Sequence, residues 1–370
     1  MDKMVTYTLY EKGNIMNIEI QDNFIQQKRY SMYPAAAYAV QGGFWICHFI
    51  VPVLYFYDVD KERITFCRNI PSKYTSEETF ASGMCVIDNK IYIAPYYGKY
   101  IIMYDIENDV FEESVRVNAD GVFRNVIWYE DTLYFFPGRC EELMKYNIKT
   151  QEIEKEKIPF SVEEKYICNV IRTKDLVVCS RYKSSEIWIY DLTKNSWESI
   201  KLTGNGWYNR MIVNGDKIYV HDYINDKVKC INISKGDFCA ELKEDISSAS
   251  PLGVYEGKMI INVETSGEWL ICDEMLNVLE RYSLQERFVP PRGWNYCMFT
   301  VKNNDGFIYY FDSCSVWTVD KDNSIVIKRM EFTPEQEEDI RRKTIGKKLI
   351  KENDFNGLEE FCQFIAEMKV

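Results

Sequence analysis

The chain has very little histidine, and the two histidines lie far apart. Among its 370 residues these are His48, inside an apolar stretch, and His221, in a polar one. Histidine is a common ligand of catalytic zinc, so this scarcity argues against a His-rich metal centre. The nucleophile, phosphate-binding and dinucleotide motifs Gly-x-Ser-x-Gly, Gly-x-x-x-x-Gly-Lys and Gly-x-Gly-x-x-Gly are also missing. We therefore expect no metal and no cofactor, and the sequence assigns no catalytic residue.

Paired cysteines and long apolar segments are missing as well. The twelve cysteines form no Cys-x-x-Cys pair and mostly stand singly in hydrophobic stretches, as buried thiols do in a reducing compartment. The longest apolar run, residues 44–57, has 14 residues and includes His48 and Pro52, so it is too short to span a bilayer. No charged leader followed by an apolar segment opens the chain. These absences predict a cytoplasmic protein with no membrane partner.

Positive charge is in deficit. Lys and Arg number 45 against 57 Asp and Glu, which gives a net charge of −12 and a pI near 5.0. Such a field repels nucleic acid unless a strong basic patch overcomes it. The two basic clusters, 328–329 and 341–343, are too short to follow a phosphate backbone. We therefore expect no nucleic-acid partner.

What the sequence does contain is a repeat of about forty residues. Seven short hydrophobic segments each close on Asp or Asn, and the steps between these residues are 47, 42, 44, 41, 41 and 47. The seven positions are Asp58, Asp105, Asn147, Asp191, Asn232, Asp273 and Asp320. A period of this length with several strands per unit is typical of a β-propeller blade. The sequence predicts an all-β, seven-bladed β-propeller.

Turn residues divide each unit into four short strands. In the second unit, residues 83–87, 91–94, 100–105 and 110–115 alternate with the turns 88–90 and 107–109 and the loop 95–98. This order predicts a four-stranded antiparallel meander, which is one blade. Gly215 and Gly257 supply the positive φ that the tight hairpins of later units require.

One segment carries a family resemblance. Tyr190-Asp191-Leu192-Thr193-Lys194-Asn195-Ser196-Trp197 resembles the Tyr-Asp-x-x-Thr-Asn-x-Trp segment of kelch repeats, and residues 104–111 are a looser copy. The kelch double glycine occurs once, at 42–43, and the closing Trp is replaced in other units. The chain thus resembles a divergent kelch-like propeller, similar to the central domain of galactose oxidase. The resemblance implies the architecture and a binding platform for proteins or sugars, and little of mechanism.

The two ends differ from the repeat. Residues 1–23 predict an N-terminal hairpin associated with closure of the ring. Residues 24–332 predict the propeller itself. An eighth, partial blade is the alternative to a total of seven blades. Thr333, Pro334 and Gln336 have the pattern of a helix start with a capping box, so residues 333–370 predict a helical C-terminal tail. Its apolar stripe either folds back on the propeller or serves as a dimer or partner contact.

The meander also locates a candidate site. The links between blades and the loops between second and third strands emerge on the same face, at the mouth of the central funnel. The predicted ligand-binding residues there are Tyr97, Arg124, Arg139, Arg181, Trp207, Tyr208, Arg210, His221, Arg292 and Trp294. Tyr96, Tyr166, Tyr182, Asp222 and Tyr223 occupy the same loops and links.

Arginine and aromatic side chains together suit a polar or anionic ligand. We expect a recognition module that binds a protein partner or a polar or anionic carbohydrate at this face. The alternative is a metal-independent carbohydrate-active enzyme, a lyase, epimerase or glycoside hydrolase, with its site in the same funnel. Ion pairs with nearby carboxylates could instead neutralise the arginines. A purely structural scaffold is the third possibility.

Overall fold

The computed structural model places most of the chain in β-strands. It describes residues 4–11, 14–21, 34–48, 52–61, 63–74, 81–96, 99–117, 123–161, 166–202, 206–243, 246, 249–255, 257–263, 266, 268–283, 300–302, 308–311, 315–319, 325–329, 333 and 335–336. Two compact units result: Tyr33–Arg329 is one, and Met1–Met32 with Met330–Val370 is the other. Within the described residues, no helix is long and apolar enough to cross a membrane.

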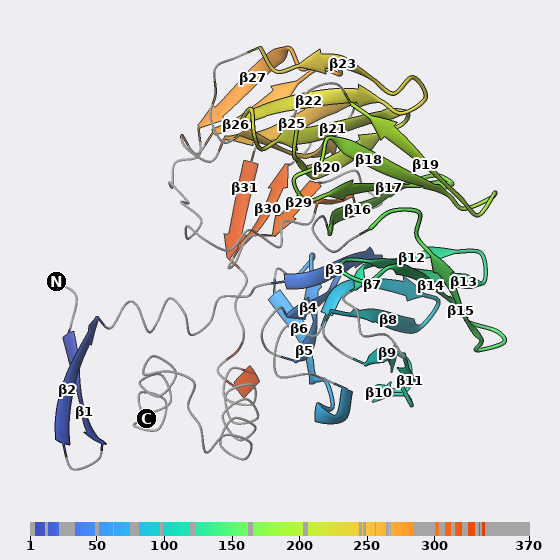
Figure 1. The fold of residues 1–370 in the computed structure, drawn as a ribbon. Coiled ribbons are helices and arrows are strands. Elements are labelled where there is room, and N and C mark those ends of the chain that lie inside the picture. Colours follow the sequence, from blue (N-terminus) through green and yellow to red (C-terminus); the bar gives the residue numbers. More distant parts are fainter. Residues whose placement is uncertain are drawn as a thin grey trace. The chain divides into compact units, whose positions relative to one another are not determined.

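The larger unit is a series of antiparallel sheets built from consecutive strands (Figure 1). Six of them are four-stranded, as the turn pattern predicts. Their strands are β3 (Pro34–Val40), β4 (Gly43–His48), β5 (Val53–Asp58) and β6 (Arg63–Asn69); β12 (Phe123–Tyr129), β13 (Thr132–Pro137), β14 (Glu142–Asn147) and β15 (Ile153–Lys157); β16 (Ile167–Thr173), β17 (Leu176–Arg181), β18 (Glu186–Asp191) and β19 (Ser196–Lys201); β20 (Tyr208–Asn214), β21 (Lys217–Asp222), β22 (Lys227–Asn232) and β23 (Asp237–Glu241); β24 (Ala249–Tyr255), β25 (Lys258–Val263), β26 (Glu268–Cys272) and β27 (Val278–Ser283); and β28 (Thr300–Lys302), β29 (Ile308–Phe311), β30 (Ser315–Val319) and β31 (Ile325–Arg329).

The remaining sheet of this unit follows the first one along the chain and differs in its outer edge. It consists of β7 (Ala81–Ile87), β8 (Lys90–Pro95), β9 (Tyr100–Asp105), β10 (Val110–Phe111) and β11 (Val115–Arg116). β10 and β11 pair with successive parts of β9, so the expected fourth strand is split in two. A short 3-10 helix, Ser72–Tyr74, precedes this sheet.

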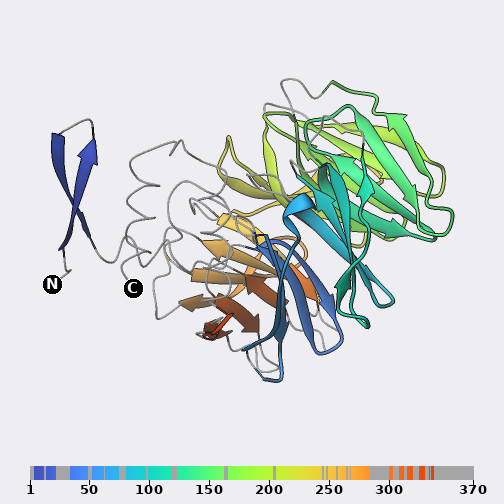
Figure 2. The ribbon, with the colours of Figure 1, turned by 90° about the horizontal axis from the view of Figure 1, so that it is seen from below.

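The first strands of the sheets contact one another in a closed cycle. β3 contacts β7, and the series continues through β12, β16, β20, β24 and β28, which contacts β3 again. In two perpendicular views the first sheet, in blue, accordingly lies beside the last, in orange-red (Figures 1 and 2). The repeated hairpins therefore wrap around a common axis rather than stack in a line.

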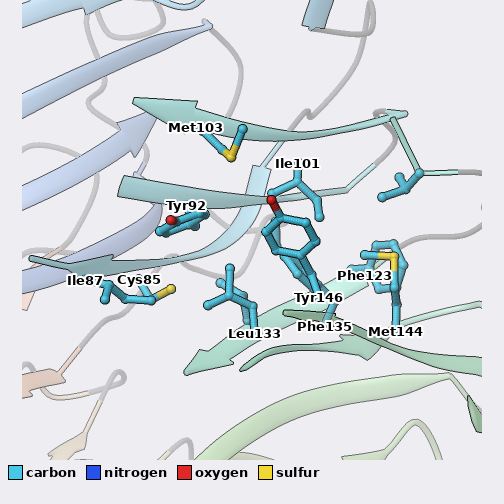
Figure 3. Close-up of a cluster of buried hydrophobic side chains, with 13 residues drawn as sticks. Cys85, Ile87, Tyr92, Ile101, Met103, Phe123, Leu133, Phe135, Met144 and Tyr146 are labelled. Carbon is cyan, nitrogen blue, oxygen red and sulfur yellow. The ribbon is translucent and has the colours of Figure 1, made fainter. Parts of the chain in front are cut away.

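The hydrophobic core lies between neighbouring sheets. One cluster joins Tyr92, Ile101 and Met103 of the second sheet to Leu133 and Phe135 of the third (Figure 3). Similar clusters fill the four other interfaces from the first sheet to the sixth. The second to fifth sheets are thus apolar on both faces, and burial of these faces supplies the driving force for the ring.

The Asp or Asn at the end of each third strand has a structural role. The Oδ1 atom of Asp105 accepts a hydrogen bond from the Asn108 backbone N–H at 2.8 Å, and Asp191 Oδ1 accepts one from Thr193 at 2.9 Å. Asp58, Asn147, Asn232 and Asp273 accept equivalent backbone bonds. Short polar side chains that bond the backbone two or three residues on stabilise tight turns. The repeat that reveals the fold is therefore a repeat of turns; Asp320 lies outside the described residues.

The kelch-like segment forms a compact contact within its sheet. Tyr190 pairs with Trp197 across β18 and β19, with ring centroids 4.9 Å apart, and its hydroxyl donates to Asn195 Oδ1 at 3.1 Å. Tyr104 and Phe111 make the equivalent ring contact at 4.9 Å in the second sheet. The two copies recognised in the sequence thus occupy equivalent positions.

The smaller unit contains the predicted hairpin and the start of the tail. β1 (Met4–Glu11) and β2 (Asn14–Gln21) pair over eight residues as a separate two-stranded sheet. The Thr333 N–H donates to Gln336 Oε1 at 2.9 Å, and the Gln336 N–H donates to Thr333 Oγ1 at 3.3 Å. This reciprocal pair is the predicted capping box. Residues 337–370 lie outside the described part, so the helical tail stays a prediction.

Candidate functional site

The candidate site is the face where each first strand begins and each second strand ends. In the fourth sheet the Tyr182 N–H donates to the Tyr166 carbonyl at 2.8 Å, one residue beyond the ends of β16 and β17. The Tyr223 N–H donates to the Trp207 carbonyl at 2.8 Å in the fifth sheet. These bonds extend both hairpins by one pair and fix four aromatic residues at the mouth.

The four rings form a continuous row across two sheets, which we call the aromatic row: Tyr166, Tyr182, Trp207 and Tyr223. Tyr166 and Tyr182 are stacked, with centroids 4.8 Å apart and planes at 9°. Tyr182 meets Trp207 edge-on at 4.6 Å, and Trp207 meets Tyr223 at 4.5 Å. Tyr223 is 52% exposed and is followed by Ile224, which is 55% exposed. The row therefore ends in an exposed apolar tip.

Two cations flank the row. The Arg139 guanidinium lies over the Tyr166 ring at 4.9 Å, and the Lys183 ammonium lies 5.1 Å from the Tyr182 centroid. Both side chains are exposed. Contacts of this kind contribute about 0.5–1 kcal/mol at exposed sites. Arg139 thus joins the third sheet to the row, as the sequence-based placement at the mouth requires.

Arg124 and Arg210 lie near the starts of their first strands, Arg124 at the second residue of β12 and Arg210 at the third residue of β20. Each is the extra residue of a β-bulge near the start of its first strand, and Arg210 adopts a left-handed φ of 50°. The bulge of Arg124 recurs at Ala35, Ser82 and Cys168, whereas the bulge of Arg210 lies one residue further along its strand and that at Leu252 lies two residues further. Arg124 Nε donates to the Cys168 carbonyl at 2.5 Å, and Arg210 Nη1 donates to Ser250 Oγ at 2.7 Å. Arg124 therefore links the third sheet to the fourth, and Arg210 links the fifth sheet to the sixth.

Arg181 is buried and paired. Its guanidinium is 3.1 Å from Glu186 Oε2, donates to the Ser161 carbonyl and lies 4.7 Å above the Phe160 ring. Burial lowers the pKa of Arg181, and Glu186 acts in the opposite direction. The sequence places Arg181 among the ligand-binding residues, whereas the structure shows it holding the link between the third and fourth sheets against the fourth sheet. Because successive side chains along an extended chain point to opposite sides, the side chains of Arg181 and Tyr182 point in opposite directions.

Asp222 takes the position of Arg181 in the fifth sheet, with the charges exchanged. It is fully buried, and its Oδ2 accepts from Lys229 Nζ and from Asn225 Nδ2, both at 2.7 Å. Burial raises the pKa of Asp222, but the hydrogen bonds from Lys229 and Asn225 outweigh it and hold the pKa below its usual range. Asp222 is therefore an ionised structural carboxylate beneath the mouth.

His221 lies beside the exposed end of the row. It is 8% exposed, its ring is 5.8 Å from that of Tyr223, and its Nε2 is 3.1 Å from Asp226 Oδ1. A neutral or charged imidazole bonded to a carboxylate can serve as a proton donor or acceptor. Across the described residues, no group of three or more His, Cys, Asp or Glu side chains could hold a metal ion.

The other predicted site residues divide into two groups. Trp207 belongs to the aromatic row, and Tyr208 is buried, 1% exposed, in the core between the fourth and fifth sheets. Tyr97, Arg292 and Trp294 lie outside the described residues. Sequence reasoning placed Tyr166, Tyr182 and Tyr223 at the mouth without recognising that they touch. Their equivalent positions before a first strand or after a second strand were the signal available.

The fold is shared with solved structures at low sequence identity. U3-55K matches with a TM-score of 0.58 and 9% identity over 80% of this chain and 95% of its own. Virginiamycin B lyase from Staphylococcus aureus matches with a TM-score of 0.57 and 10% identity over 87% and 98%. Hsv2 from Kluyveromyces lactis gives 0.55 and 10% over 81% and 98%. No protein-family model and no curated protein sequence matches the chain. The likeness does not single out the kelch type, but it shows that this chain has the β-propeller fold.

Proposed function

We propose that this β-propeller is a recognition module that binds a protein partner through the aromatic row. The observation that carries the proposal is the continuity of the row from Tyr166 to the exposed pair Tyr223 and Ile224. Tyrosine, tryptophan and arginine are the residues most enriched at the centres of protein interfaces. The rings are held against one another before any partner binds, so little side-chain entropy is lost on association.

A protein partner accounts for the row better than a sugar does. A sugar ring stacks on a free aromatic face. One face of Tyr166 is covered by Tyr182 and Arg139 lies over its ring, so this end offers little stacking surface. The arginines that would attract an anion are also engaged, Arg181 by Glu186 and Arg124 by a backbone carbonyl. What stays accessible is an apolar tip at one end of the row, with Lys183 at Tyr182 and Arg139 at the other end, which suits a partner with apolar and acidic side chains.

Removal of the tip tests the proposal. In affinity purification from the organism that produces the protein, we expect a partner that the wild type retains and that Tyr223→Ala/Ile224→Ala loses. Truncation of a central anchor costs about 2 kcal/mol or more, which is roughly 30-fold in affinity. Quantitative mass spectrometry of the retained proteins, followed by titration of the partner, measures the loss.

The matched control is Met275→Ala/Leu279→Ala, which removes a pair of similar exposure, 47% and 51%, from the third-to-fourth-strand turn and outer strand of another sheet. A partner lost equally from both double variants, or from neither, contradicts the proposal. Uronic-acid and sialic-acid oligosaccharides titrated against the wild type and Arg139→Ala test the carbohydrate alternative. Saturable binding that Arg139→Ala weakens would replace the protein partner with an anionic sugar.

One observation favours an enzyme as the second candidate. The contact between His221 and Asp226 places a possible acid or base at the mouth. One propeller neighbour is a lyase, and a histidine-to-alanine variant of it is described as catalytically inactive. If the chain is a metal-independent carbohydrate-active enzyme, we expect aryl glycosides or uronic-acid oligosaccharides to be turned over. His221→Ala would then reduce kcat by about 100-fold or more, the usual contribution of general acid–base catalysis. Absence of turnover, or unchanged kcat in His221→Ala, removes this candidate.

We further propose that the seven sheets are seven blades of a divergent kelch-like propeller, and that the protein acts in the cytoplasm. The equivalent Tyr190–Trp197 and Tyr104–Phe111 contacts support the kelch resemblance. None of the nine described cysteines is in a disulfide, which is compatible with a reducing compartment. Mass and hydrogen exchange of residues 24–332 produced alone would test whether this range is a self-sufficient ring.

A further inference from the structure

Two cysteine thiols of the fifth sheet are in direct contact. Cys230 on β22 and Cys239 on β23 have sulfur atoms 2.7 Å apart. Cys230 faces Ala240 in the register and Ile231 faces Phe238, so Cys239 is the extra residue of a bulge. A disulfide bond is about 2.05 Å long, so only a small displacement separates these atoms from bonding distance.

We propose that Cys230 and Cys239 form a site of reversible oxidation, at which a peroxide converts the two thiols into a disulfide. The bulge brings both side chains to the same face of the sheet, because the extra residue breaks the alternation of β23. A bond there would fix the outer strand of the sheet to its neighbour. The proposal is independent of the aromatic row.

The two thiols differ in accessibility. Cys239 is partly exposed, whereas Cys230 is fully buried in the core shared with the sixth sheet. Burial and the adjacent Cys239 raise the pKa of Cys230. Cys239 is therefore the thiol that a peroxide reaches first, and Cys230 is the thiol that resolves the product.

The chemistry balances with peroxide as the oxidant. Cys239 attacks one peroxide oxygen, the O–O bond breaks, and Cys239 becomes a sulfenic acid while one water is released. Cys230 then attacks the sulfenic sulfur, the S–O bond breaks, and a second water leaves with the proton of Cys230. Two electrons pass from the two sulfurs to the peroxide, and a thiol reductant reverses the reaction.

The surrounding residues hold this site between two sheets. Lys217 Nζ is 2.5 Å from Glu274 Oε2, and the Tyr219 hydroxyl donates to the Glu274 carbonyl at 3.1 Å. Lys217 and Tyr219 lie on the same face of β21, and Tyr219 pairs with Cys230 in the register, so this cation is on the face of the sheet that carries the thiols. The hydrogen bond that Lys217 donates to Glu274 is the main cause that raises its pKa. A nearby cation stabilises a developing thiolate. Cys239 is partly exposed, so this pair is accessible to an oxidant in a way that the fully buried Cys179 is not.

Peptide mapping of the full chain tests the proposal. Trypsin cleaves after Lys229, Lys235 and Lys243, so Cys230 and Cys239 fall in separate peptides. After brief treatment with hydrogen peroxide and alkylation under denaturing conditions, we expect peptides 230–235 and 236–243 joined with the loss of two hydrogens. Dithiothreitol should separate them. The linked product should form at least about ten-fold faster in folded protein than in urea, since the fold raises the effective concentration of the two thiols.

Two variants and one control complete the test. Cys239→Ser and Cys230→Ser should each abolish the linked peptide, and Cys239→Ser should leave Cys230 slow to alkylate in the folded protein. Cys140→Ser, which removes another partly buried thiol, should leave the yield unchanged. Equal rates of linkage in folded and unfolded protein, or two unlinked and separately oxidised cysteines, would overturn the proposal.

Discussion

Replacement of Gly83 by alanine is expected to destabilise the ring severely. A Cβ atom at this position would lie 2.2 Å from Asn125 Oδ1 and 2.8 Å from the Asn125 backbone in the next sheet. The clash with the backbone cannot be relieved by rotating a side chain, so the first strands of the second and third sheets must separate. Overpacking of this kind costs about 3 kcal/mol. Urea unfolding followed by tryptophan fluorescence measures the loss.

Two further variants separate steric from conformational effects. Gly257 has a φ of 76°, and a Cβ there would meet nothing within 4 Å, so Gly257→Ala should cost only about 1 kcal/mol through its left-handed backbone. Adding Asn125→Ala to Gly83→Ala removes the clash with the amide oxygen but leaves the clash with the backbone, and we expect partial recovery. Equal unfolding midpoints for Gly83→Ala and the wild type would show that the first strands are not closely packed.

The architecture could be predicted because one local interaction recurs. Asp105, Asn147, Asp191 and their counterparts each bond the backbone of a tight turn, and this chemistry tolerates only a few residue types. The apolar segments between the turns tolerate many substitutions of similar size. They therefore retain the repeat period, but their residues do not identify the propeller family. A turn residue with a fixed role is therefore the better marker of the repeat.

The site was predictable in position but not in detail. Strand polarity placed Arg124, Arg181 and Arg210 near one face. The partners of Arg124 and Arg210 depend on contacts between sheets, and that of Arg181 on strand register, and a single sequence displays neither. Arg181 is neutralised by Glu186 five residues later, a pairing set by the register of β17 and β18. Tyr166 and Tyr182 lie in different loops, and only the added backbone bond between them aligns their rings.

The loss of the Asp222 carboxylate is expected to be comparable in size to the Gly83 effect. Its side chain is fully buried and that of Lys229 is 15% exposed, so Asp222→Ala leaves the Lys229 ammonium with Glu241, at 3.8 Å, as its nearest acidic group. Removal of one partner of a buried ion pair costs about 3–5 kcal/mol. Urea unfolding at pH 7 should show a loss in this range for Asp222→Ala. A loss no larger than that of the exposed-turn variant Asp105→Asn would contradict it.

The same carboxylate should make stability depend on pH in a defined direction. Because the pKa of Asp222 is lower in the folded protein than in the unfolded chain, its contribution is complete well above the unfolded value of about 3.9 and is lost as the pH falls through the folded value. Asp222→Asn retains a side chain that can accept the Ile224 and Asn225 backbone bonds but cannot ionise. We expect this variant to be less stable at pH 7 and to lose less stability than the wild type between pH 5 and pH 3, measured by urea unfolding at each pH. Parallel curves for the two proteins would show that Asp222 does not carry this dependence.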